Sequence, residues 1–142
     1  MQIRAIVQSS DDGHAVSVST DGRVSAVSLS GRPGGGSALN GGELLCAALA
    51  TCFCNDVYRE AAKRGIAVDR VEVTVQGEFG AQGASGTNIT YQARVTAQAS
   101  EAEIRALLEH TDQVAEIHNT LRVGTPVTLE QIEAVPVPPV GA

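Results

Sequence analysis

The stretch NGGELLCAALATCFCNDVYREAAKR, residues 40–64, predicts one long helix that decides the fold. Asn40 can cap the first turn, and Glu43, at the third helical position, can bond back to the amide of Asn40. Gly65 follows as the residue that ends the helix. At 1.5 Å per residue this helix is about 36 Å long. Its first half is apolar on every face, so we expect a central helix that is covered on all sides.

Strand patterns lie on both sides of this helix. Apolar and polar side chains alternate before it, on either side of Asp21-Gly22, a pair typical of tight hairpin turns, and alternation returns after Val71. Ser100 and Glu103 can then cap a second helical region. The sequence therefore predicts a single α+β domain over residues 1–142. Its expected parts are N-terminal hairpins, the central helix, a hairpin, a second helical region and a last strand, over residues 1–36, 40–64, 71–99, 101–121 and 126–135.

The charge and the apolar runs exclude several classes of partner. The chain has a formal net charge of −6 and a pI near 4.9. Nucleic acids and anionic membrane surfaces need clustered Lys or Arg, but Lys63 is the only lysine and the arginines are scattered. The longest apolar run, residues 44–54, is too short to span a bilayer. We therefore expect no nucleic-acid or membrane partner and, without a signal-like N-terminus, a cytoplasmic protein.

The three cysteines all fall in the predicted central helix, at Cys46, Cys52 and Cys54. An odd, closely spaced set does not build a disulfide framework, so we expect free thiols. Neither spacing from Cys52 puts two thiols on one helical face. The histidines fall at no ligand spacing, and the Gly-rich loop over residues 31–36 lacks the Lys-Ser/Thr of a phosphate loop. The sequence therefore predicts no metal and no cofactor.

Cys52 has three interpretations: a small buried packing residue, a nucleophilic thiolate or, last, a metal ligand. A nucleophile needs a lowered pKa, and the start of the helix is too far away to supply it. Arg59 shares the face of Cys52 but lies about 10 Å along the axis. Arg23 or Arg32, from a loop, is an equally plausible partner. Asp56, one turn on, disfavours ionisation of Cys52 unless Arg59 pairs with it.

Glu43 also has two interpretations. It can act only as a capping residue of the central helix, or it can be an active-site carboxylate that holds an arginine in place. The capping interpretation needs no catalytic assumption, and the sequence leaves both open.

The sequences SALNGGELL (residues 37–45) and AALATCF (47–53) resemble the central-helix motif of the OsmC/Ohr family, the osmotically inducible and organic hydroperoxide resistance proteins. The sequence NTLRVGTPV (119–127) is similar to a second-helix region of the same family. The resemblance extends over the chain in the order of its elements. It implies an intertwined homodimer, in which antiparallel sheets wrap a pair of central helices and the active sites lie at the subunit interface.

The resemblance also implies a chemistry for Cys52. Peroxidases of the family use the matching cysteine to attack the peroxide bond, and a second cysteine traps the resulting sulfenic acid as a disulfide. Here Ala115, or a close neighbour, falls where the second cysteine would be, and no cysteine follows Cys54. The arginine of the hydroperoxide-resistance branch falls near Asp11, and its glutamate falls on Gly42. Glu43 matches the variant of other OsmC-like branches.

These observations lead to a first hypothesis with two alternatives. The first is a Cys52-dependent peroxidase that reduces organic hydroperoxides in oxidative stress defence, with Glu43 and either Arg23 or Arg32 as partners of the thiol. An external thiol, Cys46 or Cys54 would then reduce the sulfenate. The alternatives are a non-catalytic protein that binds a small molecule and a purely structural dimer.

Overall fold

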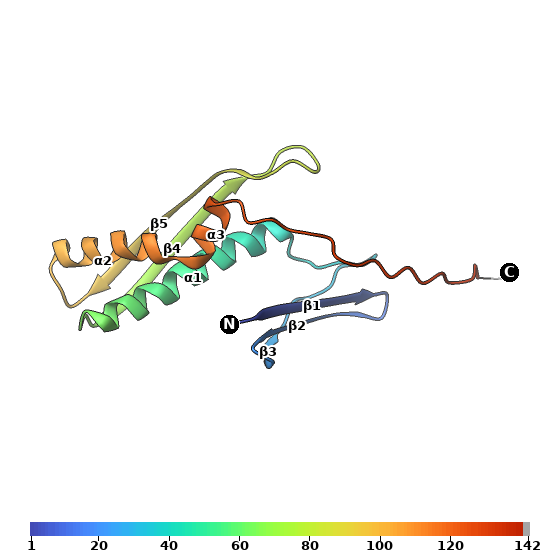
Figure 1. Cartoon of the computed structure of the whole chain (residues 1–142), viewed down its shortest axis with the longest axis horizontal. Helices are drawn as coiled ribbons and strands as arrows, with labels where there is room; N and C mark the ends of the chain where they lie inside the picture. Colours follow the sequence, from blue (N-terminus) through green and yellow to red (C-terminus); the bar gives the residue numbers. More distant parts are fainter. Residues whose placement is uncertain (141–142) are drawn as a thin grey trace.

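The computed structural model describes residues 1–140 and contains two antiparallel sheets and three helices (Figure 1). The elements in chain order are β1 (Ile3–Ser10), β2 (Gly13–Thr20), β3 (Arg23–Val27), α1 (Gly41–Lys63), β4 (Val68–Glu78), β5 (Thr87–Ala97), α2 (Glu101–Val114) and α3 (Glu116–Arg122). The α+β class is confirmed. Among the described residues no helix is both long and apolar enough to cross a membrane.

Helix α1 begins and ends as its sequence predicts. The amide of Glu43 donates to the Asn40 side chain at 2.8 Å, and the amide of Asn40 donates to the Glu43 carboxylate at 3.0 Å. This reciprocal pair satisfies two of the amides that a helix start leaves free. At the other end Gly65 takes a positive φ of 67°, and the amide of Ile66 bonds to the carbonyl of Ala61. Local chemistry therefore fixes both ends of the helix.

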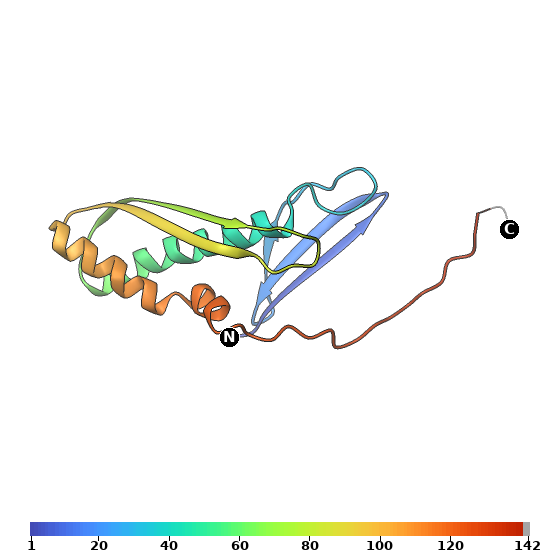
Figure 2. The same cartoon turned by 90° about the horizontal axis from the view of Figure 1, so that it is seen from above.

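The core lies between α1, the β4–β5 hairpin and α2 (Figures 1 and 2). Strands β4 and β5 pair antiparallel, with Val71 opposite Val95 and Val73 opposite Ala93. These side chains alternate with exposed polar ones and pack against the buried face of the second half of α1. The fully buried members of this core come from α1, α2 and the residue between α2 and α3: Phe53, Val57, Ala61, Leu107 and Ala115.

The N-terminal sheet stands apart from this core. It has the order β1-β2-β3, and Figures 1 and 2 show it beside the N-terminal part of α1 rather than packed on the hairpin. Every residue of β1 and β3 is exposed, including the apolar Ile3, Val7 and Val24. In α1, Leu49 is the only buried residue between Gly41 and Cys52. The expected cover on all sides of α1 is therefore not supplied by this chain itself.

Two details of the C-terminal third differ from the prediction. The second helical region is divided at Ala115, whose extended ψ of 105° separates α2 from α3. The single chain has no strand over residues 126–135: Figures 1 and 2 show the chain extended there, and Val127 is 98% exposed. An isolated extended segment leaves its amides and carbonyls to water, and the prolines that flank it have no amide to donate.

Candidate thiol site

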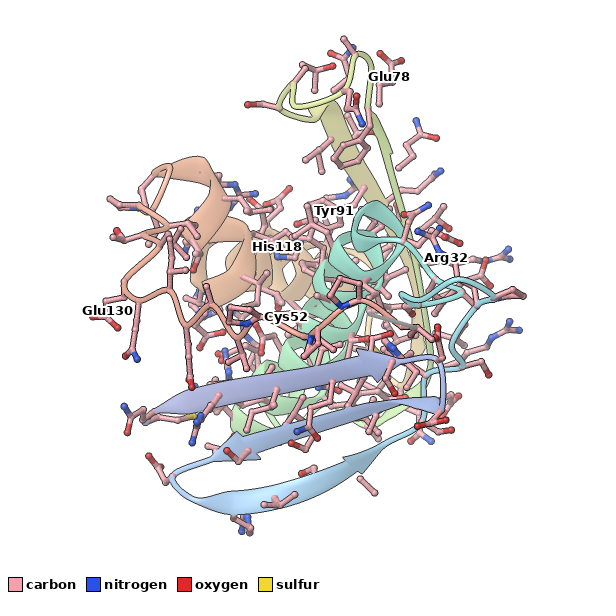
Figure 3. The ribbon with its side chains drawn as sticks, turned by 90° about the vertical axis from the view of Figure 1, so that its right-hand side faces the viewer. Arg32, Cys52, Glu78, Tyr91, His118 and Glu130 are labelled. Atoms are coloured by element: carbon pink, nitrogen blue, oxygen red, sulfur yellow. The ribbon has the colours of Figure 1, made fainter. Side chains whose placement is uncertain are left out.

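Cys52 lies in the middle of α1 and is half-buried, beside the start of α3 (Figure 3). Its thiol donates a hydrogen bond to Oδ2 of Asp56 at 3.6 Å. The two residues are four positions apart on one helix, so their side chains share a face. The sulfur therefore faces a carboxyl group directly, in a partly buried setting.

Arg59 links this carboxyl group to α3. Its Nη1 lies 2.9 Å from Oδ1 of Asp56 and 3.4 Å from Oε1 of Glu116, and its Nε lies 2.9 Å from Oε1 of Glu60. Asp56 was expected to oppose ionisation of Cys52 unless Arg59 paired with it, and this pairing is present. The guanidinium, however, contacts the carboxylates and not the sulfur.

Glu60 holds the guanidinium of Arg59 through its Nε. This carboxylate is buried and also accepts from Lys63 at 3.0 Å, while a ring nitrogen of His110 lies 3.2 Å away. Hydrogen bonds from Arg59 and then Lys63 lower the pKa of Glu60 to about 2. Glu60 therefore stays ionised well into the acidic range and fixes one edge of the guanidinium.

Cys52, Asp56 and Glu116 together bring a sulfur and two carboxylate oxygens within 4.8 Å of one another. Three such donors can bind a divalent cation, but Arg59 already supplies positive charge to both carboxylates. The cluster is better suited to holding and moving a proton. The break at Ala115 creates it, because α3 then begins with Glu116 turned toward α1.

The surroundings of Cys52 favour the neutral thiol. Burial raises its pKa, a hydrogen bond from the Ile117 backbone opposes that effect, and the negative charges of Asp56 and Glu116 raise the pKa further. A nucleophilic Cys52 requires a cation that lowers this pKa. Arg59, the arginine of this cluster, is instead paired with the carboxylates of Asp56 and Glu116.

The carboxyl groups of Asp56 and Glu116 differ in their affinity for a proton. Asp56 is only 5% exposed, and burial followed by the charge of Glu116 raises its pKa, although Arg59 opposes the shift. The pKa of Glu116 is lowered, first by its own backbone amide and then by Arg59. A proton that enters this pair therefore resides on Asp56.

The sequence model of the OsmC-like protein family matches residues 34–130, which include α1, the β4–β5 hairpin, α2 and α3. The chain belongs to the OsmC-like protein family.

Solved structures share the fold of this OsmC-like chain. One is an OsmC-like protein from Mycoplasma pneumoniae, with 20% identity over 85% of this chain and 86% of that chain and a TM-score of 0.62. Another is an organic hydroperoxide resistance protein from Legionella pneumophila, with 24% identity over 86% of this chain and 90% of that chain and a TM-score of 0.59. A third is an organic hydroperoxide resistance protein from Elizabethkingia anophelis, with 18% identity over 86% of this chain and 89% of that chain and a TM-score of 0.60. Comparison with curated proteins gives no match.

The site residues predicted from sequence are not gathered at Cys52 within one OsmC-like chain. Glu43 lies in the first turn of α1, where its carboxylate caps the helix. Nε of Arg32 donates to the carbonyl of Gly35 at 3.2 Å in its own loop, and Figure 3 shows it away from Cys52. Arg23 is exposed at the start of β3. No hydrogen bond or ion pair within residues 1–140 joins either arginine to the sulfur.

Sequence reasoning did not find Glu116 as a member of this cluster. Asp56 and Arg59 could be found, because their spacing from Cys52 places all three on neighbouring helical positions. Glu116 gives no such signal, since its approach to α1 depends on the break at Ala115. Cys46 and Cys54 are free, half-buried thiols on the same helix.

A separate pocket lies between α1, the hairpin and α3. It has a volume of about 340 Å³, and its wall includes Leu49, Tyr91 and His118. His118 is 5% exposed, neither ring nitrogen has a hydrogen-bond partner in the described chain, and burial lowers its pKa. Tyr91 lies beside it, with ring centroids 4.7 Å apart, and donates its hydroxyl to Asp112 (Figure 3). This volume is at the small end of ligand pockets.

Proposed function

We propose that this OsmC-like chain is a thiol peroxidase that reduces organic hydroperoxides through Cys52 and so contributes to oxidative stress defence. The observation that carries the proposal is the polar cluster around the sulfur: a half-buried thiol bonded to Asp56, with Arg59 behind it. Purely structural cysteines are surrounded by apolar side chains and are inert. The organic hydroperoxide resistance proteins of the same fold support the proposal.

The active form we propose is a homodimer. The N-terminal half of α1 and the strands β1 and β3 expose apolar side chains, such as Ile3 and Val24, that a second copy can cover. A dimer also offers what a single chain lacks at Cys52, a cation close to the sulfur. Arg23 or Arg32 of the second copy is the proposed source, with Glu43 as its carboxylate partner. Such a cation would offset the raised pKa of the thiol.

The reductant we propose is an external thiol. Attack of the Cys52 sulfur on the hydroperoxide gives a sulfenic acid and an alcohol. A second thiol then condenses with the sulfenic acid to a disulfide and releases water, and a further external thiol reduces that disulfide and frees the Cys52 thiol. Ala115 stands where the family's second cysteine would be, so the partner thiol comes from outside the chain, or from Cys46 or Cys54. The reaction needs no cofactor, and free cysteines suit a reducing cytoplasm.

A second candidate function is the binding of a small molecule without turnover. The specific observation in its favour is the pocket of about 340 Å³ that contains the unpartnered His118, together with the raised pKa of Cys52. This function predicts a Cys52 that alkylates slowly near neutral pH and forms no sulfenate.

Intact-mass spectrometry after exposure to tert-butyl hydroperoxide distinguishes a peroxidase from a protein that only binds a small molecule. The peroxidase gains one oxygen atom as a sulfenic acid, which dimedone converts to a thioether adduct with loss of water, and the Cys52→Ser variant forms neither. Matched Cys46→Ser and Cys54→Ser variants should still form both. Equal oxygen uptake by the wild type and Cys52→Ser would refute the peroxidase.

A further inference from the structure

We propose that Asp56 is the proton-transfer group for Cys52 and that Glu116 is the positioning residue that maintains Asp56 as a base. The inference rests on the proposed peroxidase activity. It assigns the acid–base step to a carboxyl pair that connects α1 to α3.

The geometry gives the two oxygens of Asp56 separate roles. Oδ2 accepts a hydrogen bond from the thiol of Cys52 at 3.6 Å, whereas Oδ1 lies 2.9 Å from Nη1 of Arg59. The ion pair therefore holds the carboxylate while the other oxygen stays directed at the sulfur. A general base must lie within reach of the proton that it takes, and bonds of this kind are often long without substrate.

Burial and a neighbouring negative charge raise the pKa of Asp56, which suits it to exchange a proton with a thiol. The Asp56 side chain is buried and Glu116 lies beside it, so its carboxyl group has a higher pKa than an ordinary aspartate. The higher pKa brings the carboxyl group nearer to the thiol in proton affinity, which favours transfer between them. Once Asp56 holds the proton, the ionised Glu116 can accept a hydrogen bond from it. The titratable and charged groups of this network come from three helices. Helix α1 supplies Asp56, Arg59, Glu60 and Lys63, α2 supplies His110, and α3 supplies Glu116.

The proposed step balances in atoms and electrons. The thiol proton of Cys52 passes to Oδ2 of Asp56, and the thiolate attacks the terminal oxygen of the hydroperoxide. A sulfur–oxygen bond forms as the oxygen–oxygen bond breaks. The sulfur loses two electrons and becomes a sulfenic acid, and the hydroperoxide is reduced to an alkoxide. Asp56 then gives its proton to the alkoxide, which leaves as an alcohol.

This role makes a prediction that a merely electrostatic carboxylate does not share. The negative charge of Asp56 raises the pKa of the Cys52 thiol. If charge were its only effect, removing it would produce more thiolate and a faster reaction with hydroperoxide. If Asp56 transfers the proton, removing it produces more thiolate and a slower reaction. A variant with more thiolate but slower peroxide reduction therefore identifies Asp56 as a proton-transfer group.

The experiment uses a Cys46→Ser, Cys54→Ser background, in which Cys52 is the only thiol. The pH dependence of alkylation by iodoacetamide gives the thiol pKa, and dimedone trapping with tert-butyl hydroperoxide gives the rate of sulfenate formation. We expect Asp56→Asn to lower the thiol pKa and to slow sulfenate formation by about 100-fold or more. Glu72→Gln, in an exposed ion pair with Arg70, is the matched control and should change neither.

Glu116→Gln tests the pair without removing the group that touches the sulfur. Loss of its charge lowers the pKa of Asp56 and also that of the Cys52 thiol. The acidic limb of the pH–rate profile for sulfenate formation should therefore move to lower pH by more than the thiol pKa that alkylation measures; an equal move would mean that Glu116 acts on the thiol alone. A role limited to packing would leave that limb in place. This variant also decides the question if Asp56→Asn fails to fold, as judged by circular dichroism.

Each outcome has one meaning. A wild type that forms sulfenate, with an Asp56→Asn variant that forms it as fast or faster, overturns the proton-transfer role and leaves the peroxidase standing. An unmoved acidic limb in Glu116→Gln overturns the role of Glu116. A wild type that forms no sulfenate refutes the peroxidase and this inference with it.

Discussion

The sulfur of Cys52 lies 3.6 Å from Oδ2 of Asp56, one helical turn further along α1. Their spacing on α1 brings the two together, and Arg59, a further turn along, pairs with the carboxylate. The thiol of a single chain is therefore held neutral by its neighbours while its proton has an acceptor in reach. For the proposed peroxidase, this combination means that a cation from outside the chain must stabilise the thiolate.

Removal of Arg59 should destabilise the chain. The Arg59→Ala variant leaves the buried carboxyl of Asp56 without its ion-pair partner, and leaving a buried group unsatisfied costs about 1–3 kcal/mol. Because the guanidinium is partly exposed, water screens the pair and the lower end applies. Urea unfolding measures the change. The matched control, Arg70→Ala, breaks an exposed pair with Glu72 and should cost about 0.5 kcal/mol or less. Equal losses in the two variants would contradict the role of Arg59.

Glu60 should make stability depend on pH in the acidic range. Its folded pKa, about 2, is below its ordinary value of 4.5, so it contributes stability above the unfolded pKa. That contribution is lost as pH falls from about 4.5 toward 2. The Glu60→Gln variant should be less stable near neutral pH and show a flatter decline below about pH 4.5 in urea unfolding. A decline as steep as that of the wild type would argue that other carboxylates dominate.

The exposed face of α1 allows a direct test of the dimer. Ala47 lies on the exposed part of the N-terminal half of α1, and Ala102 is exposed in the first turn of α2. In a monomer, Ala47→Glu and Ala102→Glu should both be tolerated, since each places a charge in water. In the proposed dimer, Ala47→Glu buries an unpaired charge and should shift the sedimenting species from twice 14.6 kDa toward 14.6 kDa, whereas Ala102→Glu should not. Dimers of equal strength in both variants would place the interface elsewhere.

The activating cation should come from the second copy. If Arg23 or Arg32 of a partner approaches Cys52, replacing that arginine by Ala raises the pKa of the thiol and slows its alkylation near neutral pH. Iodoacetamide kinetics on the two variants identify the arginine. Arg105→Ala, which disrupts only an exposed pair with Glu101, is the control. Unchanged alkylation in both Arg23→Ala and Arg32→Ala would remove these residues from the site.

How far the sequence predicts this molecule depends on whether the deciding interaction is local. The ends of α1 are local, since Asn40, Glu43 and Gly65 each act within one turn, and the prediction of α1 was confirmed. A strand needs a neighbour, and residues 126–135, which were expected to form the last strand, pair with none in the described chain. The position of Glu116 depends on the break at Ala115 and on the packing of α3 on α1. Neither follows from spacing, so the sequence indicated Asp56 and Arg59 but not the carboxyl pair.

His118 should make the fold sensitive to mild acid. Burial lowers its pKa, and both ring nitrogens lack hydrogen-bond partners within the described residues, so the folded chain holds the neutral ring. A group with a lowered folded pKa contributes stability above its unfolded value, about 6.5 for histidine, and loses it as the pH falls. We expect His118→Phe, which keeps the aromatic contacts with Phe53 and Tyr91, to unfold at higher urea concentration. It should also lose part of the decline in stability as the pH falls below about 6.5. If His118→Phe is less stable than the wild type at every pH, the ring is bonded to a ligand or to a second copy in solution, and the pocket beside it is occupied.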